Sequence, residues 1–235
     1  MDAMLLAAGR GERMRPLSDS TPKPLLEIAG KAMIVRQIEA LAQAGVRRLV
    51  INHAWLGAQI EAALGDGRRH GVNILWSREG SALGTAGGVV QALALLQGER
   101  LLVASADIHT DYDYARLAGS ALPQRDDLAH LVLVDDRRVQ QDFDLHDGRV
   151  RAGSAPALTY GNIGVFRRAL FDGLTPGASA DLGRLLRAAV AAGRVSGERH
   201  QGIWDNVGTP QDLERVNACA GMPSKTCTTP PPESP

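Results

Sequence analysis

The chain has 235 residues, and its 26 lysines and arginines balance 26 aspartates and glutamates, so its formal net charge is zero. This balance argues against a protein that binds nucleic acid through a broad basic face, and the 4% aromatic content argues against base-stacking platforms. No apolar run approaches the ~18 residues of a membrane span, and the N-terminus lacks the features of a secretory signal. We therefore expect a cytoplasmic protein whose partners are neither nucleic acid nor membrane.

The first hundred residues alternate apolar runs with segments of helical periodicity. The apolar runs predict buried strands at residues 2–7, 49–51, 72–76 and 101–104. The helical spacing predicts helices at residues 32–44, 58–64 and 87–96. Strands that alternate with helices at these lengths indicate βαβ units, and hence a largely parallel sheet covered by helices on both faces.

The second half of the chain predicts a sheet of mixed direction. Strands are expected at 131–134 and 160–166, helices at 182–192 and 210–218, and a hairpin over 143–150 that turns at Asp147-Gly148. No internal segment is rich enough in proline, glycine or serine to mark a linker. We therefore expect one domain over residues 1–218, followed by a disordered C-terminal tail over residues 219–235.

A glycine-rich loop follows the first predicted strand. Gly9 and Gly11 lie where open α/β sheets bind ligands, and glycine lets backbone N–H groups approach phosphate oxygens closely. The alternative for such a pair is an ordinary tight turn. The P-loop pattern is absent, and a dinucleotide fingerprint would need glycine in place of Met14 and an acidic residue in place of Asn52. These departures disfavour NAD.

Three cations follow the glycines closely in the sequence. Arg13 and Arg15 each offer a bidentate fork to phosphate, whereas Lys23 supplies a compact point charge. Lys23 stands between Pro22 and Pro24, which predicts a stiff extended segment that holds the ammonium in a fixed place. A polyanionic ligand is therefore compatible with a chain of zero net charge.

The loop, LAAGRGERMRPL at residues 6–17 with PKPL at 22–25, resembles the pattern of the sugar-1-phosphate nucleotidyltransferase family. The resemblance implies an α/β, Rossmann-like nucleotidyltransferase fold with a mixed, mainly parallel central sheet and helices on both faces. It makes Arg13 and Lys23 the catalytic residues, which bind the departing pyrophosphate and the α-phosphate. Together with the LGTAG pattern at 83–87, it implies that the nucleotide contacts Leu6, Ala8, Gly9, Gly11, Glu12, Arg13, Lys23, Glu79, Gly84 and Thr85.

The same resemblance implies a Mg²⁺ site. Asp107 follows the fourth predicted strand, and an aspartate there is otherwise most often a turn or capping residue. The family's second ligand comes from a late W-x-D-[VI]-G-T-P pattern, in which Asn206 holds the matching position and Asp205 precedes it. Adjacent side chains of an extended segment point to opposite faces, so the two are alternatives. We favour Asn206. Its side chain is neutral, so we expect it to bind Mg²⁺ more weakly than a site with two aspartates would.

Four further segments narrow the resemblance to the bacterial N-acetylmuramate 1-phosphate uridylyltransferases of peptidoglycan recycling: NHAWLG at 52–57, TDYD at 110–113, HLVLV at 130–134 and VSGE at 195–198. The resemblance implies that the sugar contacts Ser105, Asp142, Asn162 and Gly164. Gln141 stands where the subfamily has glycine, which weakens the transfer of a role to Asp142.

The expected partners are thus an NTP, with UTP favoured, and a sugar 1-phosphate. The alternatives are a mannose-1-phosphate guanylyltransferase and a non-catalytic, nucleotide-sensing regulatory relative. The sequence leaves open whether the protein is a homo-oligomer.

Overall fold

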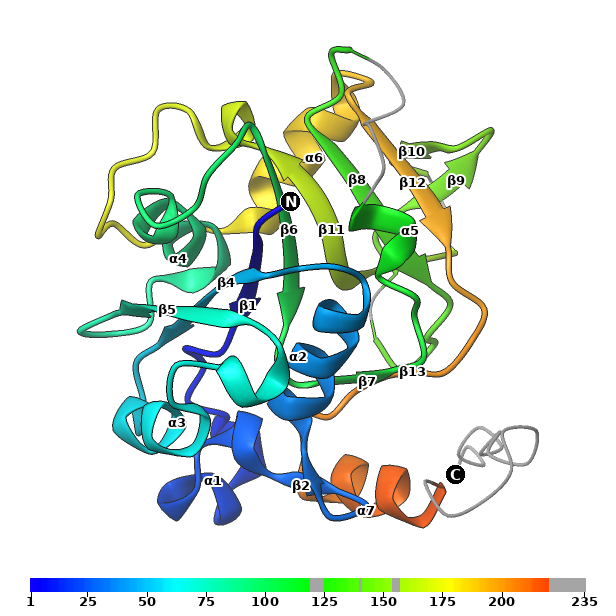
Figure 1. The fold of residues 1–235 in the computed structure, drawn as a ribbon. Helices are drawn as coiled ribbons and strands as arrows, with labels where there is room; N and C mark the ends of the chain where they lie inside the picture. Colours follow the sequence, from blue (N-terminus) through cyan, green and yellow to red (C-terminus); the bar gives the residue numbers. More distant parts are fainter. Residues whose placement is uncertain (119–124, 140, 154–156, 220–235) are drawn as a thin grey trace.

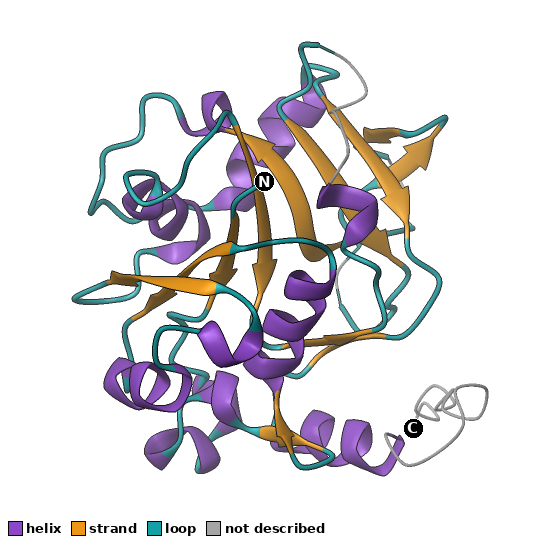
Figure 2. Cartoon of the chain, viewed as in Figure 1, coloured by secondary structure: helices purple, strands orange, loops and turns teal. Residues whose placement is uncertain are grey.

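A nine-stranded sheet runs through the computed structural model, which describes residues 1–118, 125–139, 141–153 and 157–219 (Figures 1 and 2). In spatial order its strands are β5 (Asn73–Arg78), β4 (Arg48–His53), β1 (Ala3–Leu6), β6 (Arg100–Ser105), β11 (Thr159–Arg167), β8 (Ala129–Val134), β12 (Val195–Arg199), β10 (Arg149–Arg151) and β9 (Asp144–His146). All of them run in one direction except β11 and β10. The predicted mixed, mainly parallel sheet is therefore confirmed.

Helices cover both faces of the sheet because side chains alternate along each strand. In β1, Leu5 belongs to one buried cluster with residues of α2 (Met33–Gln43) and α3 (Gly57–Leu64). Met4 points to the other face, where it shares a cluster with residues of α4 (Gly84–Ala92) and α6 (Leu182–Ala191). The shorter helices are α1 (Leu17–Ser20) and α5 (Ala115–Ala118).

Two small sheets were not predicted, because their strands have two or three residues each. The first pairs β7 (Ile108–Thr110) with β13 (Trp204–Asn206), and places Asn206 opposite Ile108. The second pairs β2 (Glu27–Ile28) with β3 (Lys31–Ala32). The first of these matters for function, since it brings residues 204–206 to the carboxyl end of β6.

The helix α4 begins at Gly84 and ends at Ala92, so the predicted span of 87–96 was shifted toward the C-terminus. A tertiary contact explains the early start: the N–H groups of Ala86 and Gly87 donate to the carbonyl oxygen of Ala180, at 3.1 and 3.3 Å. Such a contact leaves no periodic signal in the sequence.

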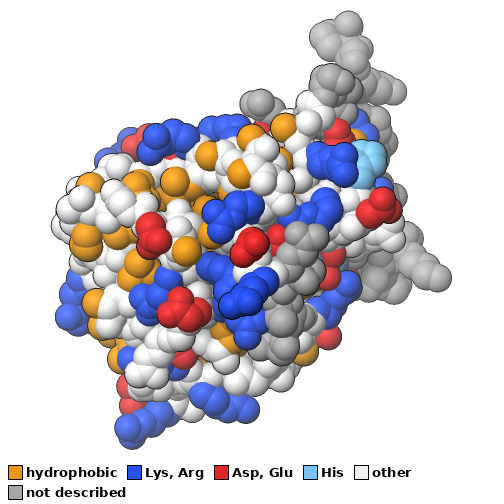
Figure 3. Space-filling model, turned by 90° about the horizontal axis from the view of Figure 1, so that it is seen from above, with side chains coloured by type: hydrophobic (Ala, Val, Ile, Leu, Met, Phe, Trp, Pro, Cys, Tyr) orange, Lys and Arg blue, Asp and Glu red, His pale blue; other side chains and the backbone are white. Residues whose placement is uncertain are grey.

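Arginines at the amino end of the parallel strands bind backbone carbonyls. Arg168 donates to the carbonyl oxygen of Leu93 at 3.1 Å, and Arg48 donates to that of Leu95 and pairs with Asp2. Figure 3 shows this end of the molecule, where acidic side chains lie among the lysines and arginines. The charge here is therefore mixed, and these two arginines satisfy carbonyls that follow the last turn of α4.

The last helix, α7 (Pro210–Cys219), ends one residue beyond the predicted domain boundary at residue 218. The rest of the predicted tail, residues 220–235, lies outside the described residues. None of the helices in the described ranges is long and apolar enough to cross a bilayer.

Candidate active site

The glycine loop lies at the carboxyl end of β1 and leaves open space above Gly9. A Cβ built on Gly9 would meet no atom within 4 Å, so a ligand can approach this backbone. Gly11 has a φ of +68°, which disfavours other residues, and its Cβ would lie 3.1 Å from the Cβ of Lys23. The loop therefore combines an accessible backbone with close packing on Lys23.

Lys23 is fixed by Asp107, which follows β6. Its Nζ donates to Asp107 Oδ2 at 2.5 Å, and the exposed fractions of the two side chains are 10% and 29%. The prediction of an extended segment was wrong, because Lys23–Leu25 forms a 3-10 turn closed by the Leu26 N–H on the Lys23 carbonyl. Pro24 tolerates this turn since it needs no N–H there.

Arg13 reaches the segment that follows β13. A Cβ on Gly208 would lie 3.1 Å from Arg13 Nη2, so the guanidinium rests against this glycine. The neighbouring Met14 is fully buried in one cluster with Val207, and the Val207 N–H donates to the Asp107 carbonyl at 3.1 Å. Arg13, Lys23, Asp107 and residues 206–208 are thus gathered at one place.

The two alternatives for the second metal ligand have different surroundings. Asp205 Oδ1 accepts from Arg138 at 2.6 Å and from Arg215 at 2.7 Å, so its charge is already neutralised. Hydrogen bonds to Asp136 and Asp205 raise the pKa of Arg138, which keeps it charged. Asn206 instead lines the cleft described below, and its amide makes no hydrogen bond within the described residues.

A buried hydrogen-bond chain ties the glycine loop to the segment after β5. Asn52 Oδ1 accepts from the Ala7 N–H at 2.9 Å, and its Nδ2 donates to Glu79 Oε1 at 2.6 Å. Glu79 Oε2 accepts from the Leu83 N–H at 2.9 Å, and the residue is 6% exposed. Both carboxylate oxygens of Glu79 therefore contact protein, so its contact with a nucleotide stays a prediction. The role of Asn52 was missed, although a polar residue at the end of an apolar strand was its signal.

Replacing Asn52 with alanine is expected to lower the free energy of unfolding by about 1–3 kcal/mol, because a buried N–H and a buried carboxylate each lose a partner. Urea unfolding measures this change. Asn73→Ala, which alters an exposed asparagine of β5, is the control and is expected to stay within about 0.5 kcal/mol. An equally small change for Asn52→Ala would contradict this role.

The glycines of the LGTAG segment are explained by packing. Gly84 has a φ of +72°, and Cβ atoms on Gly84 and Gly87 would lie 2.8 Å from the Ala180 oxygen and 2.5 Å from the Ala178 oxygen. Thr85, between them, is exposed and lines the cleft. Of this segment, Thr85 is therefore the residue that faces the cleft, and its contact with a nucleotide stays a prediction.

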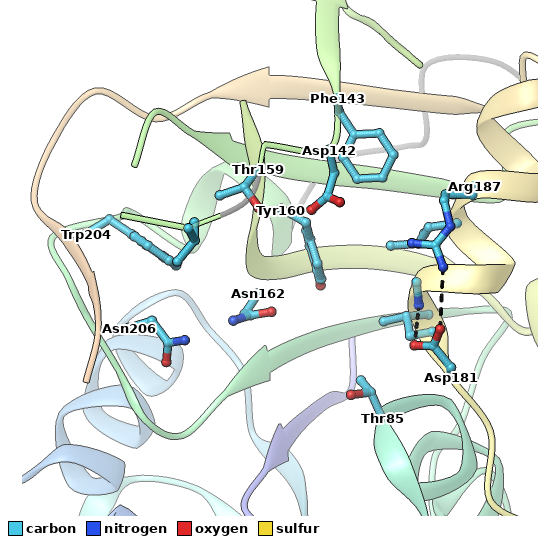
Figure 4. A pocket seen from close by; sticks show the side chains of 14 residues that line it. Thr85, Asp142, Phe143, Thr159, Tyr160, Asn162, Asp181, Arg187, Trp204 and Asn206 are labelled. Atoms are coloured by element: carbon cyan, nitrogen blue, oxygen red, sulfur yellow. Dashed lines mark hydrogen bonds and ion pairs between the residues drawn. The ribbon is translucent and has the colours of Figure 1, made fainter. Parts of the chain in front are cut away.

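The cleft has a volume of about 390 Å³ and gathers four of the predicted residues: Thr85, Asp142, Asn162 and Asn206 (Figure 4). Asn162 has a φ of +57° within the β-bulge of β11, which turns its side chain into the cleft. Asp142 Oδ2 accepts from the Thr159 hydroxyl at 3.2 Å.

The remaining predicted residues lie outside the lining of the cleft. Gly164 is buried in β11, and its Cβ would lie 2.9 Å from the His130 carbonyl, so its small size serves strand packing. Ser105 ends β6 opposite Leu6 of β1. Ala8 is buried in the loop and Glu12 is exposed. Tyr160 and Arg187 are among the lining residues that were not predicted, and no motif marks Arg187.

Residues 2–144 match the nucleotidyl transferase family, and this span contains the glycine loop, Lys23 and Asp107. The chain belongs to this family. Such nucleotidyltransferases take an NTP and a sugar 1-phosphate as substrates, and they generally use a divalent metal.

Relatives of this nucleotidyltransferase extend over nearly its whole length. It is 48% identical to the N-acetylmuramate alpha-1-phosphate uridylyltransferase of Neisseria meningitidis, over 94% of this chain and 99% of that protein. It is 29% identical to the mannose-1-phosphate guanylyltransferase of Mycobacterium tuberculosis, over 93% of this chain and 64% of that protein. A Bacillus anthracis structure assigned as a glucose-1-phosphate thymidylyltransferase shares its fold, with a TM-score of 0.82, 19% identity and coverage of 94% and 95%.

The residues present fit a divalent metal ion whose coordination is completed by water and substrate. In the described part of this nucleotidyltransferase, no group of three or more His, Cys, Asp and Glu side chains is placed to hold a metal. Asp107 offers a partly exposed carboxylate, and Asn206 offers an amide oxygen that has no hydrogen-bond partner among the described residues. Such a sparse oxygen set suits an ion that takes its other ligands from water and phosphates.

Proposed function

We propose that this nucleotidyltransferase is a Mg²⁺-dependent enzyme that transfers UMP from UTP to N-acetylmuramate 1-phosphate and releases pyrophosphate. The observation that carries the proposal is the pairing of Lys23 with Asp107 beside the open backbone of Gly9, next to the cleft that holds Asn162 and Asn206. The 48% identity to the Neisseria enzyme supports the choice of substrates. A cytoplasmic location and a role in peptidoglycan recycling remain predictions.

The reaction forms a bond between an oxygen of the sugar 1-phosphate and the α-phosphorus of UTP, and it breaks the bond from that phosphorus to pyrophosphate. A phosphate monoester has a second pKa near ~6, so the nucleophile is already an anion at neutral pH. No side chain has to remove a proton. The protein therefore acts by aligning two polyanions and by neutralising their charge.

Each candidate site residue is assigned a distinct role in the proposed reaction. Lys23 would hold an oxygen of the α-phosphate, since its ammonium is fixed by Asp107. Arg13, exposed beside Gly208, would bind the departing pyrophosphate. Asp107 and Asn206 would hold Mg²⁺, which when bound offsets charge on the reacting phosphates. Asp142 and Asn162 would contact the sugar, and Thr85 the nucleotide.

Pyrophosphate release from each of the four common NTPs with N-acetylmuramate 1-phosphate, and with mannose 1-phosphate, tests the choice of substrates. We expect UTP with the muramate sugar to exceed every other pair by at least about tenfold in kcat/KM, a difference of about 1.4 kcal/mol. Activity confined to GTP and mannose 1-phosphate would identify the guanylyltransferase alternative. Nucleotide binding without release from any pair would identify a non-catalytic regulator.

A further inference from the structure

A cation lies at the end of the cleft that is far from the metal candidates. Arg187 projects from α6, while Asn206 lies at the other side of the cleft and Asn162 between the two (Figure 4). A sugar whose 1-phosphate lies near Asn206 and whose ring covers Asn162 would therefore direct its far substituents toward Arg187.

The guanidinium of Arg187 has capacity for another partner. Among the described residues its ion-pair partner is Asp181, whose Oδ2 lies 3.7 Å from Nη2, beyond hydrogen-bond distance. The Asp181 oxygens already accept from the N–H groups of Gly183 at 2.9 Å and Arg184 at 3.1 Å, as the cap of α6. Within the described residues Arg187 donates no hydrogen bond, and its side chain is 60% exposed. A Cβ on Gly183 would lie 3.2 Å from Nη1, so this glycine leaves room for the guanidinium.

The charges of the residues that line the cleft indicate what Arg187 would bind. Among the described lining residues, Asp142 and Asp181 are carboxylates and Arg187 is the only lysine or arginine. Asp142 would repel an acidic group of the sugar that lay near it. Among the described lining residues, Arg187 alone carries a positive charge that can neutralise such a group. Arginine presents the planar fork that matches a carboxylate.

We propose that Arg187 binds the carboxylate of the sugar substrate, and thereby selects an acidic sugar 1-phosphate over a neutral one. This inference rests on the proposed function, because N-acetylmuramate differs from N-acetylglucosamine by a lactyl ether that carries a carboxylate. Arg187 is thus a specificity residue, remote from the phosphates that react.

Steady-state kinetics with two sugar 1-phosphates tests the proposal: N-acetylmuramate 1-phosphate, and its carboxamide, in which a neutral amide replaces the carboxylate. For the acid, Arg187→Gln is expected to raise KM about 10- to 100-fold, the value of a charge-assisted hydrogen bond, with kcat within about twofold. The KM for the carboxamide should stay unchanged. Arg187→Lys should recover part of the preference for the acid.

Arg184→Gln is the matched control, since Arg184 is an exposed arginine of the same helix that does not line the cleft. If Arg187→Gln keeps the wild-type preference for the acid, the proposal is overturned while the proposed function stands. If wild type does not use N-acetylmuramate 1-phosphate at all, the proposed function fails and the inference fails with it. Should the glutamine variant not fold, Arg187→Ala and Arg187→Lys give the same comparison.

Discussion

Replacing Lys23 with alanine is expected to lower kcat for pyrophosphate release by about 10²- to 10³-fold, the range seen when one fixed donor to a developing charge is removed. The ammonium is held at 2.5 Å by Asp107 in a side chain that is 10% exposed, so its position in the site is fixed. Pyrophosphate release under saturating UTP and sugar 1-phosphate measures the loss. Circular dichroism verifies that the chain is folded.

Lys31→Ala is the control for this change, because Lys31 is 45% exposed and pairs with Glu39 at the surface. Its kcat should equal that of wild type. Arg13→Ala should also lose orders of magnitude, since the exposed guanidinium beside Gly208 is the cation offered to pyrophosphate. Near-normal turnover in both Lys23→Ala and Arg13→Ala would refute the assignment of these residues.

Replacing Asp107 with asparagine is expected to lower kcat at least about 10²-fold and to raise the Mg²⁺ concentration needed for half-maximal activity. Asp107 supplies the charged oxygen of the candidate metal pair and also fixes Lys23, so one change removes two functions. A Mg²⁺ titration of pyrophosphate release measures both effects. Asp111→Asn is the control, since Asp111 pairs with His200 and is 52% exposed.

The assignment of Asn206 as the second metal ligand also predicts how substitutions in β13 change the Mg²⁺ requirement. Asn206→Asp adds a second carboxylate and should lower the Mg²⁺ requirement, whereas Asp205→Asn should leave it unchanged because Asp205 already serves Arg138 and Arg215. If Asp205→Asn shifts the Mg²⁺ titration and Asn206→Asp does not, the alternative ligand is the correct one.

The sequence could predict those features that depend on local pattern. The buried strand β1 followed from an apolar run, and the hairpin at Asp147-Gly148 followed from two residues that tolerate positive φ, here +48° and +72°. Lys23 and Asp107 could be named because both stand in segments that resemble the nucleotidyltransferase pattern, and parallel strands bring their carboxyl ends to the same edge of the sheet.

The features that could not be predicted depend on contacts between distant segments. Asn52 and Glu79 are 27 residues apart, so the strand end that marks Asn52 gives no sign of its partner. Gly84 and Gly87 resemble a ligand loop in sequence, yet their Cβ positions are filled by residues 178–180. Arg187 lies on an ordinary amphipathic helix, and its place in the cleft follows from the packing of α6 on the sheet.

The most direct test of the central claim follows oxygen-18 from the phosphate of N-acetylmuramate 1-phosphate during reaction with UTP and Mg²⁺. Phosphorus NMR and mass spectrometry locate the label. Attack of the sugar phosphate on the α-phosphorus predicts that all label stays in the UDP-sugar and that pyrophosphate carries none. Label in free phosphate or pyrophosphate, or the absence of a UDP-sugar, would contradict the account.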